Sequence, residues 1–173
     1  MDLQEALRDY REKIVNEWVD YTLSTYESSK FFKREQDKFA NPTGGTVRDA
    51  LSGLFSLLAQ ADKDGEQDPD YRDAVMPLML LRSVQEFTPS QAVAPINAVK
   101  HIVRKVLASD KETRHLASEL YDFDFKVDLA MLAAFDQYTA SRERMYQLRV
   151  NEIKTGKSVL TDSKCPSKLF SKV

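Results

Sequence analysis

The chain has 173 residues, of which 42% are hydrophobic and 10% aromatic, and this composition suffices for one folded domain with a hydrophobic core. Its 25 basic and 27 acidic residues leave a net charge of -2, which excludes the strongly positive surface of a protein that binds nucleic acid without sequence preference. The sequence has no apolar run of about 20 residues and begins with charged residues, so we expect a cytoplasmic protein that is not an integral membrane protein.

Apolar residues recur at spacings of three and four, and glycine and proline are few, so we expect an all-α fold. Five main helices are predicted. In chain order they cover residues 2–23, 43–61, 69–87, 88–109 and 110–155, with a short helix carrying Phe31 and Phe32 between the first two.

Capping residues mark the predicted helix starts. Asp2 and Asp110 suit N-cap positions, and the pairs Asp68–Pro69 and Thr88–Pro89 join an N-cap to a proline in the first turn. Pro95 lies inside a predicted helix, so we expect it to bend that helix.

The last predicted helix is the longest, because no helix breaker occurs before Gly156. Its roughly 45 residues would form a rod about 65 Å long. Its apolar residues mostly alternate steps of four and three, the pattern of a helix seam, and they thin out beyond Tyr138. We therefore expect Tyr138, Met145 and Leu148 to form a seam with a second copy of the chain or with a partner protein. Residues 156–173 are predicted to be a flexible polar tail that follows a domain over residues 1–155.

No catalytic residue and no metal ligand is expected. The segment Thr155–Ser158 resembles the end of a phosphate-binding loop, but Asn151 stands where that motif needs glycine. His101 and His115 have no nucleophile beside them in the sequence. Cys165 is the single cysteine, which excludes an internal disulfide bond.

Methionine and phenylalanine side chains of the predicted core would suit an adaptable apolar pocket, although ordinary core packing explains them as well. The candidate pocket residues are Phe55, Met76, Met79, Phe87, Met131 and Phe135. A second hypothesis is a redox carrier or sensor that holds haem or another cofactor around Met76, Met79 and His101. Such a protein would be coloured.

The segment from Leu80 to Val93, LLRSVQEFTPSQAV, is specific enough to indicate a family. It resembles a stretch of the N-terminal domains of RsbT co-antagonist (RsbR-type, RsbRD) stressosome proteins. The matching residues are Arg82, Gln85, Thr88, Pro89, Ser90 and Gln91. Trp18 and Phe39–Pro42 look like further landmarks of that family, so the resemblance covers about residues 3 to 150.

The resemblance implies a globin-like helical homodimer without haem that serves as a sensory domain in stress-response signalling. Residues 69–87 contain no histidine, which agrees with the absence of haem, and we expect no cofactor. In the family the last helix leads into a phosphorylatable domain, whereas only 17 residues follow Gly156 here. We therefore expect a free-standing, non-enzymatic input module that binds an unidentified regulatory protein and a small apolar signal. Thr88 and Ser90 have a structural role as capping and turn residues that explains their presence.

Overall fold

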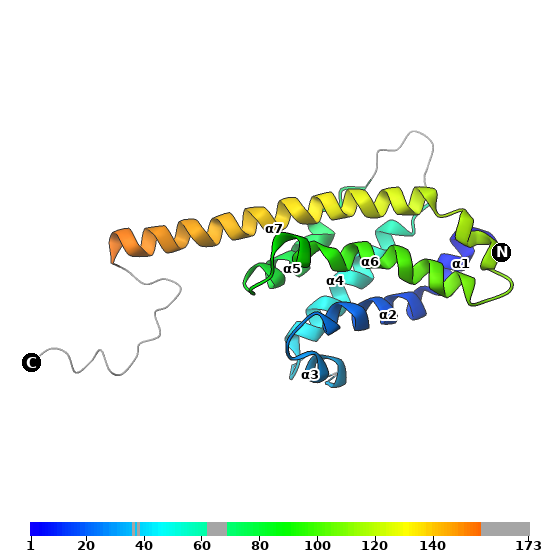
Figure 1. Cartoon of the computed structure of the whole chain (residues 1–173), viewed down its shortest axis with the longest axis horizontal. Coiled ribbons are helices and arrows are strands. Elements are labelled where there is room, and N and C mark those ends of the chain that lie inside the picture. The colour runs from blue at the N-terminus through cyan, green and yellow to red at the C-terminus, as the bar shows by residue number, and fades with distance from the viewer. Residues whose placement is uncertain (36, 38, 62–68, 157–173) are drawn as a thin grey trace, which may run out of the picture.

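The computed structural model describes residues 1–35, 37, 39–61 and 69–156. These residues form helices and no strand, so the predicted all-α class is confirmed. The helices are α1 (Leu3–Asp9), α2 (Arg11–Ser24), α3 (Ser29–Arg34), α4 (Pro42–Leu58), α5 (Arg72–Ser83), α6 (Pro89–Ala108), the short 3-10 helix η1 (Arg114–Ser118) and α7 (Tyr121–Thr155) (Figure 1).

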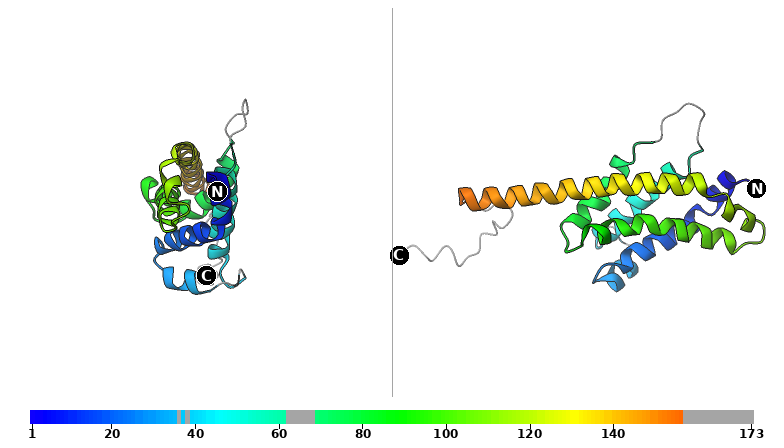
Figure 2. Two further views of the ribbon diagram at one scale, coloured as in Figure 1. Left: turned by 90° about the vertical axis from the view of Figure 1, so that its right-hand side faces the viewer. Right: turned by 45° about the horizontal axis from the view of Figure 1, so that its top comes forward.

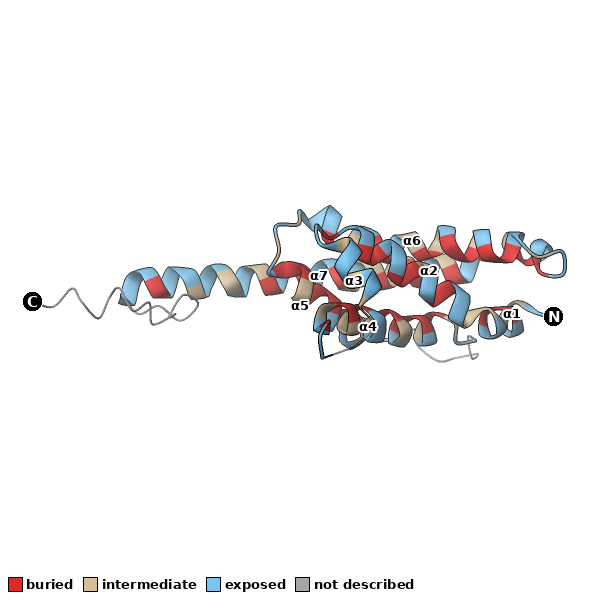
Figure 3. Ribbon diagram, turned by 90° about the horizontal axis from the view of Figure 1, so that it is seen from below, coloured by how far each residue is buried: buried red, intermediate tan, exposed pale blue. Residues whose placement is uncertain are grey.

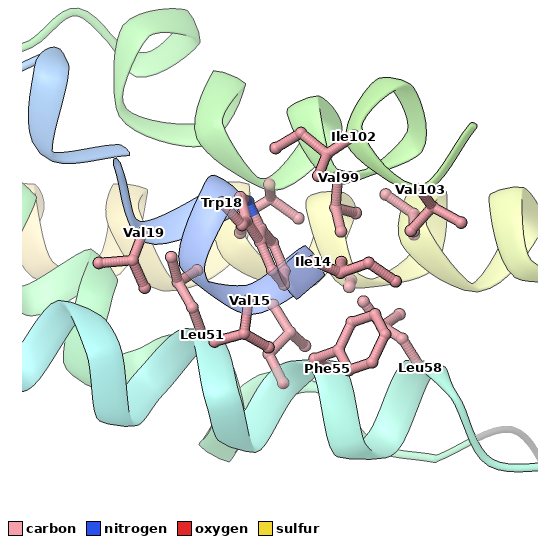
Figure 4. Packing of buried hydrophobic residues seen from close by; sticks show 14 of the residues in the cluster. Ile14, Val15, Trp18, Val19, Leu51, Phe55, Leu58, Val99, Ile102 and Val103 are labelled. Atoms are coloured by element: carbon pink, nitrogen blue, oxygen red, sulfur yellow. The ribbon is translucent and has the colours of Figure 1, made fainter. Parts of the chain in front are cut away.

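The core forms where α2 lies between α4 and α6 (Figure 4). Trp18 of α2 is fully buried, and burial of a large apolar side chain contributes about 1.5–3 kcal/mol. On the two neighbouring helices a stripe of apolar residues faces the core, and every member is buried: Val47, Leu51, Leu54, Phe55 and Leu58 on α4, and Ala92, Ile96, Val99, Val103 and Val106 on α6.

The first predicted helix is in fact two helices. Tyr10 separates α1 from α2 with φ -90° and ψ 6°, and its hydroxyl donates to the carboxylate of Asp110 at 2.5 Å. The N-cap at Asp2 is confirmed, because its carboxylate accepts from the backbone N–H of Glu5 in a complete capping box. Tyr21 of α2 shares the helical spacing of the buried Trp18 but is 46% exposed.

Two further helix starts differ from the prediction. Helix α5 begins at Arg72 without a side-chain cap and ends at Ser83, so it is shorter than the predicted 69–87, and Asp68 lies outside the described residues. Asp110 does not begin the last helix. Its carboxylate accepts from the Glu112 backbone N–H and from the Tyr10 hydroxyl, and η1 precedes α7.

Helix α7 packs along α5 and α6 with its first half, and its second half extends beyond the other helices (Figure 2). The extended half is largely exposed (Figure 3). Gly156 ends the helix in the left-handed conformation with φ 65°, as the sequence predicts. The long C-terminal helix is confirmed, with 35 residues. The proposed tail and Cys165 lie outside the described residues.

Candidate functional site

Arg82, the first residue of the family-like motif, is fully buried at the end of α5. Its Nη1 donates to Thr25 Oγ1 at 3.1 Å and its Nη2 donates to the Gln91 carbonyl at 3.0 Å. The guanidinium carbon lies 4.0 Å from the ring centre of Phe87 and 5.1 Å from that of Tyr26. Within the described residues, this buried cation is therefore held by neutral acceptors and aromatic rings instead of a carboxylate.

The position of Pro95 explains why an arginine is needed here. Proline has no backbone N–H, so inside α6 it leaves the carbonyl four residues earlier, that of Gln91, without its helical donor. Arg82 supplies the missing donor. The carbonyl of Pro95 itself accepts from Trp18 Nε1 at 2.6 Å. Two buried donors from other helices thus hold α6 at its proline.

The remaining motif residues build the start of α6. Thr88 is the N-cap and forms a capping box with Gln91, and Pro89 follows in the first turn. The hydroxyl of Ser90 lies 3.2 Å from that of Thr88. The structural role that the sequence indicates for Thr88 is therefore confirmed. Gln85 differs from these residues, because its Oε1 is buried and has no hydrogen-bond partner.

A cavity of about 370 Å³ lies between the end of α2, the start of α3 and the turn that joins α5 to α6. Three aromatic rings line it, with Tyr26 in edge-to-face contact with Phe32 at 5.7 Å and with Phe87 at 5.6 Å. Its lining consists of Thr25, Tyr26, Glu27, Ser28, Phe32, Gln85, Glu86 and Phe87. We call it the α2–α5 cavity.

Tyr26 gives this cavity a buried polar group. The residue is 5% exposed, and its hydroxyl makes no hydrogen bond of ordinary geometry, although the Arg82 guanidinium is near enough to lower its pKa. Burial raises the pKa of Tyr26, and the nearby charge of Arg82 offsets this only in part. The Tyr26 phenol is therefore neutral at physiological pH.

The motif turn is tied directly to α7. Tyr138 of α7 is buried, and its hydroxyl donates to the Phe87 carbonyl at 2.5 Å. Arg142, one turn further on, donates from Nη1 to the Ser83 carbonyl at 3.0 Å. Tyr138 is also the last buried hydrophobic residue of α7. The wall of the cavity is thus connected to α7 at the point where α7 leaves the other helices.

The predicted seam residues divide between two environments. Tyr138 belongs to the core of the protomer, whereas Met145 and Leu148 are half-buried on the extended part of α7. A different set of α7 residues is apolar and 46–81% exposed. At about 100° per residue they fall within an arc of about 80°, and we call them the α7 stripe: Tyr121, Phe125, Leu132, Phe135, Tyr146, Val150 and Ile153.

Helix α5, which packs against α7, carries exposed apolar residues as well. Met76, Leu80 and Val84 are 40%, 42% and 64% exposed. They follow one another at intervals of four, which places them along one side of this segment. Sequence reasoning missed both sets, because an exposed apolar stripe has the same spacing as a buried one.

The predicted pocket residues lie in different environments. Phe55 and Met79 are fully buried in the core, whereas Met76 and Phe135 are 40% and 47% exposed. Met131 is partly buried against the core. Of the six, Phe87 alone borders the α2–α5 cavity. The signal that marks this cavity, poorly satisfied polar atoms beside aromatic rings, depends on tertiary structure and is invisible in the sequence.

The histidines lie at the surface. His101 is exposed on α6, apart from the buried Met79, and His115 is exposed in η1. Two acidic residues of α7 form ion pairs with α6, Asp124 with Arg104 and Asp128 with Lys100. Across the described residues, no group of three or more histidine, cysteine, aspartate or glutamate side chains could hold a metal ion.

A comparison with protein-family models finds one family, described as the RsbT co-antagonist protein rsbRD N-terminal domain, over residues 12–153. The searches of curated proteins and of solved structures found no match. In the described part of the chain, no helix combines the length and apolar character needed to cross a membrane.

Proposed function

Because the chain belongs to the family of RsbT co-antagonist rsbRD N-terminal domains, we propose that it is a cytoplasmic, non-enzymatic sensory module that pairs with a second copy of itself through the α7 stripe. The family is one of stressosome-type signalling domains, as the LLRSVQEFTPSQAV segment indicates. The paired α7 helices would present the regulatory surface to a partner protein.

The observation that carries this proposal is the α7 stripe itself. Large side chains such as Leu132 and Ile153 are 61% and 76% exposed, and exposed apolar surface typically marks an interface. Three polar residues lie within the same arc and interrupt the stripe: Asp128, Thr139 and Glu143. The stripe runs from Tyr121 at the start of the helix to Ile153 near its end. Its length suits pairing with another long helix, and a second copy supplies an identical stripe about a twofold axis.

The polar side of α7 supports the same assignment. Around its extended half most of the remaining exposed positions are charged or amidic, for example Arg144, Gln147 and Asn151. A helix whose exposed apolar residues gather along one side suits pairing along that side. The exposed residues Met76 and Leu80 of the adjacent α5, and Val84 directly after it, would widen the interface.

The mass of the full chain in solution tests the proposal. We expect light scattering after size-exclusion chromatography to give twice the 19.8 kDa of one chain. The double variant Leu132→Glu/Ile153→Glu should give the mass of a monomer, because two buried carboxylates oppose the apolar contact. The double variant should keep the helical circular dichroism of the wild type.

Arg144→Glu is the matched control. It changes the net charge by the same two units as the double variant but lies on the polar side of α7, where Arg144 is exposed. We expect it to remain dimeric. A monomeric wild type at 100 µM, or a dimer that the double variant leaves intact, would contradict the proposal.

A further inference from the structure

Beyond pairing, we propose that the α2–α5 cavity binds a small organic amine with an apolar body and that Phe87 reports its occupancy to α7. This inference rests on the proposed sensory function and assigns that function a site and a class of signal. It also revises the expectation of a purely apolar ligand, because the lining of the cavity is aromatic and rich in hydrogen-bond acceptors.

Two buried polar atoms in the lining of the cavity are poorly satisfied. Gln85 Oε1 has no hydrogen-bond partner, and the Tyr26 hydroxyl makes no hydrogen bond of ordinary geometry and is influenced only by the nearby Arg82 guanidinium. Both residues line the cavity. Buried polar groups are normally paired, and an unpaired one destabilises the fold. A bound molecule with N–H groups could donate one hydrogen bond to Gln85 Oε1 and another to the hydroxyl oxygen of Tyr26.

The charged side chains that line the cavity are acidic. Glu27 and Glu86 line the cavity and are both exposed to solvent, and no lysine, arginine or histidine lines it. The guanidinium of Arg82 lies against the rings of Phe87 and Tyr26 and is outnumbered by the two carboxylates. Carboxylates, an amide oxygen and aromatic rings together favour an ammonium group over a carboxylate or phosphate.

Phe87 connects the cavity to α7. The ring of Phe87 borders the cavity, while its carbonyl accepts from Tyr138 of α7. A molecule that shifts Phe87 therefore acts on the hydrogen bond that holds α7 where it leaves the bundle. The volume of about 370 Å³ lies within the range of small-molecule sites.

The test uses three probes of similar shape and different charge with the full chain. We expect isothermal titration calorimetry to detect binding of 2-phenylethylamine, and to show at least about tenfold weaker binding of neutral 2-phenylethanol and of anionic 3-phenylpropionate. Equal binding of the neutral and cationic probes, or no binding of the amine, would overturn the proposal.

Variants separate a ligand site from a structural cluster. Gln85→Leu and Tyr26→Phe each remove a poorly satisfied polar atom, so both should weaken amine binding by about tenfold while leaving the melting temperature of the free protein unchanged or raised. Gln147→Leu makes the same change at an exposed position of α7. It should alter neither the affinity for the amine nor the melting temperature. A lower melting temperature with unchanged amine affinity would show that both residues are structural, which would overturn the assignment.

Hydrogen exchange tests the connection. The amine should change amide exchange within residues 138–156 of the wild type, and Tyr138→Phe should remove that change while retaining amine binding. Binding without any change in α7 would refute the reporting role of Phe87. The oligomeric mass, measured on the same samples, reports on pairing independently, so a failure of amine binding and a failure of pairing are distinguishable.

Discussion

Pro95 lacks the backbone N–H that would normally bond to the Gln91 carbonyl, and Arg82 donates to that carbonyl instead. Two residues thirteen positions apart in the sequence therefore depend on each other. The motif residue Arg82 has a structural explanation that does not require any contact with a ligand.

A double-mutant cycle tests this dependence. Arg82→Met should lower the free energy of unfolding by about 3 kcal/mol, because it removes two buried hydrogen bonds and leaves the Gln91 carbonyl unpaired. In a Pro95→Ala background, Arg82→Met should lower the free energy of unfolding by about 1 kcal/mol less, because the backbone N–H of the new alanine can donate to the Gln91 carbonyl. Urea denaturation of the four proteins measures both values.

Pro77 of α5 provides the control background. It also lies inside a helix, but the carbonyl that it leaves free, that of Asp73, is not an acceptor of Arg82. The losses from Arg82→Met and Pro77→Ala should therefore add. Additivity in the Pro95 cycle as well would disprove the link between Arg82 and Pro95.

The hydrogen bond between Tyr10 and Asp110 predicts a dependence on pH. Donation from the Tyr10 hydroxyl lowers the pKa of Asp110, and the same bond raises the pKa of Tyr10. The lowered carboxyl pKa stabilises the fold above the ordinary value of about 4, and this contribution is lost as the pH falls through the folded pKa. The raised pKa of Tyr10 stabilises the fold below the ordinary tyrosine value of about 10, and this second contribution is lost as the pH rises through the folded pKa.

The Tyr10→Phe variant makes this measurable. Its melting temperature should lie below that of the wild type between about pH 5 and pH 9, and the difference should shrink below pH 4 and above pH 10. Tyr21→Phe, at an exposed tyrosine of α2, should show no such window. A difference that is constant across the whole pH range would rule out this bond as the cause.

At the scale of the elements, two glycines of α4 occupy contrasting environments. A Cβ on Gly44 would lie 2.3 Å from Asn41 Nδ2. The Asn41 side chain cannot easily move, because it donates to the carbonyls of Phe32 and Glu35 and accepts from the Gly44 N–H as the N-cap. A Cβ on Gly53 would meet nothing within 4 Å.

The two alanine substitutions should therefore have opposite effects. Gly44→Ala should lower the free energy of unfolding by about 1–2 kcal/mol through loss of the Asn41 cap. Gly53→Ala should raise it by up to about 1 kcal/mol, because alanine favours the helix and no atom obstructs it. Chemical denaturation measures both. Equal effects of the two substitutions would show that the contacts of Asn41 do not fix the start of α4.

Elements with both a cap and a regular apolar stripe were predictable. Helix α6 has Thr88 and Pro89 at its start and a stripe that is entirely buried, and both signals are local. The bond between Tyr10, at the junction of α1 and α2, and Asp110 was not predictable, because the two residues lie one hundred positions apart in the sequence. No local signal showed that η1 would stand between Asp110 and α7.

The candidate sites were less predictable than the fold. The motif from Arg82 to Gln91 was identified from its sequence, but the relation of Arg82 to Pro95 and to the rings of Tyr26 and Phe87 exists only in three dimensions. The seam prediction followed the stripe that contains Tyr138, which the protomer buries in its own core. Spacing alone gives no information on which of two stripes on α7 faces the core.

In the whole molecule, the bundle buries one side of α7, and the second half of the helix projects from the bundle and is largely exposed (Figures 1 and 3). The α7 stripe, on another side of the helix, runs from the bundle out along this extended half. Pairing through this stripe would place the two motif turns and the two extended helices in one assembly. The globin-like character of the bundle stays a prediction.

Disulfide trapping tests this arrangement most directly. In a Cys165→Ser background, single cysteines replace Leu132, Tyr146, Val150 or Ile153 of the stripe, and Arg144 or Asn151 on the polar side serve as controls. Under mild oxidation, we expect covalent dimers from stripe positions and monomers from Arg144→Cys and Asn151→Cys, as read on non-reducing gels. Cross-linking that is uniform along α7, or strongest at Arg144 and Asn151, would contradict the pairing of two chains through the α7 stripe.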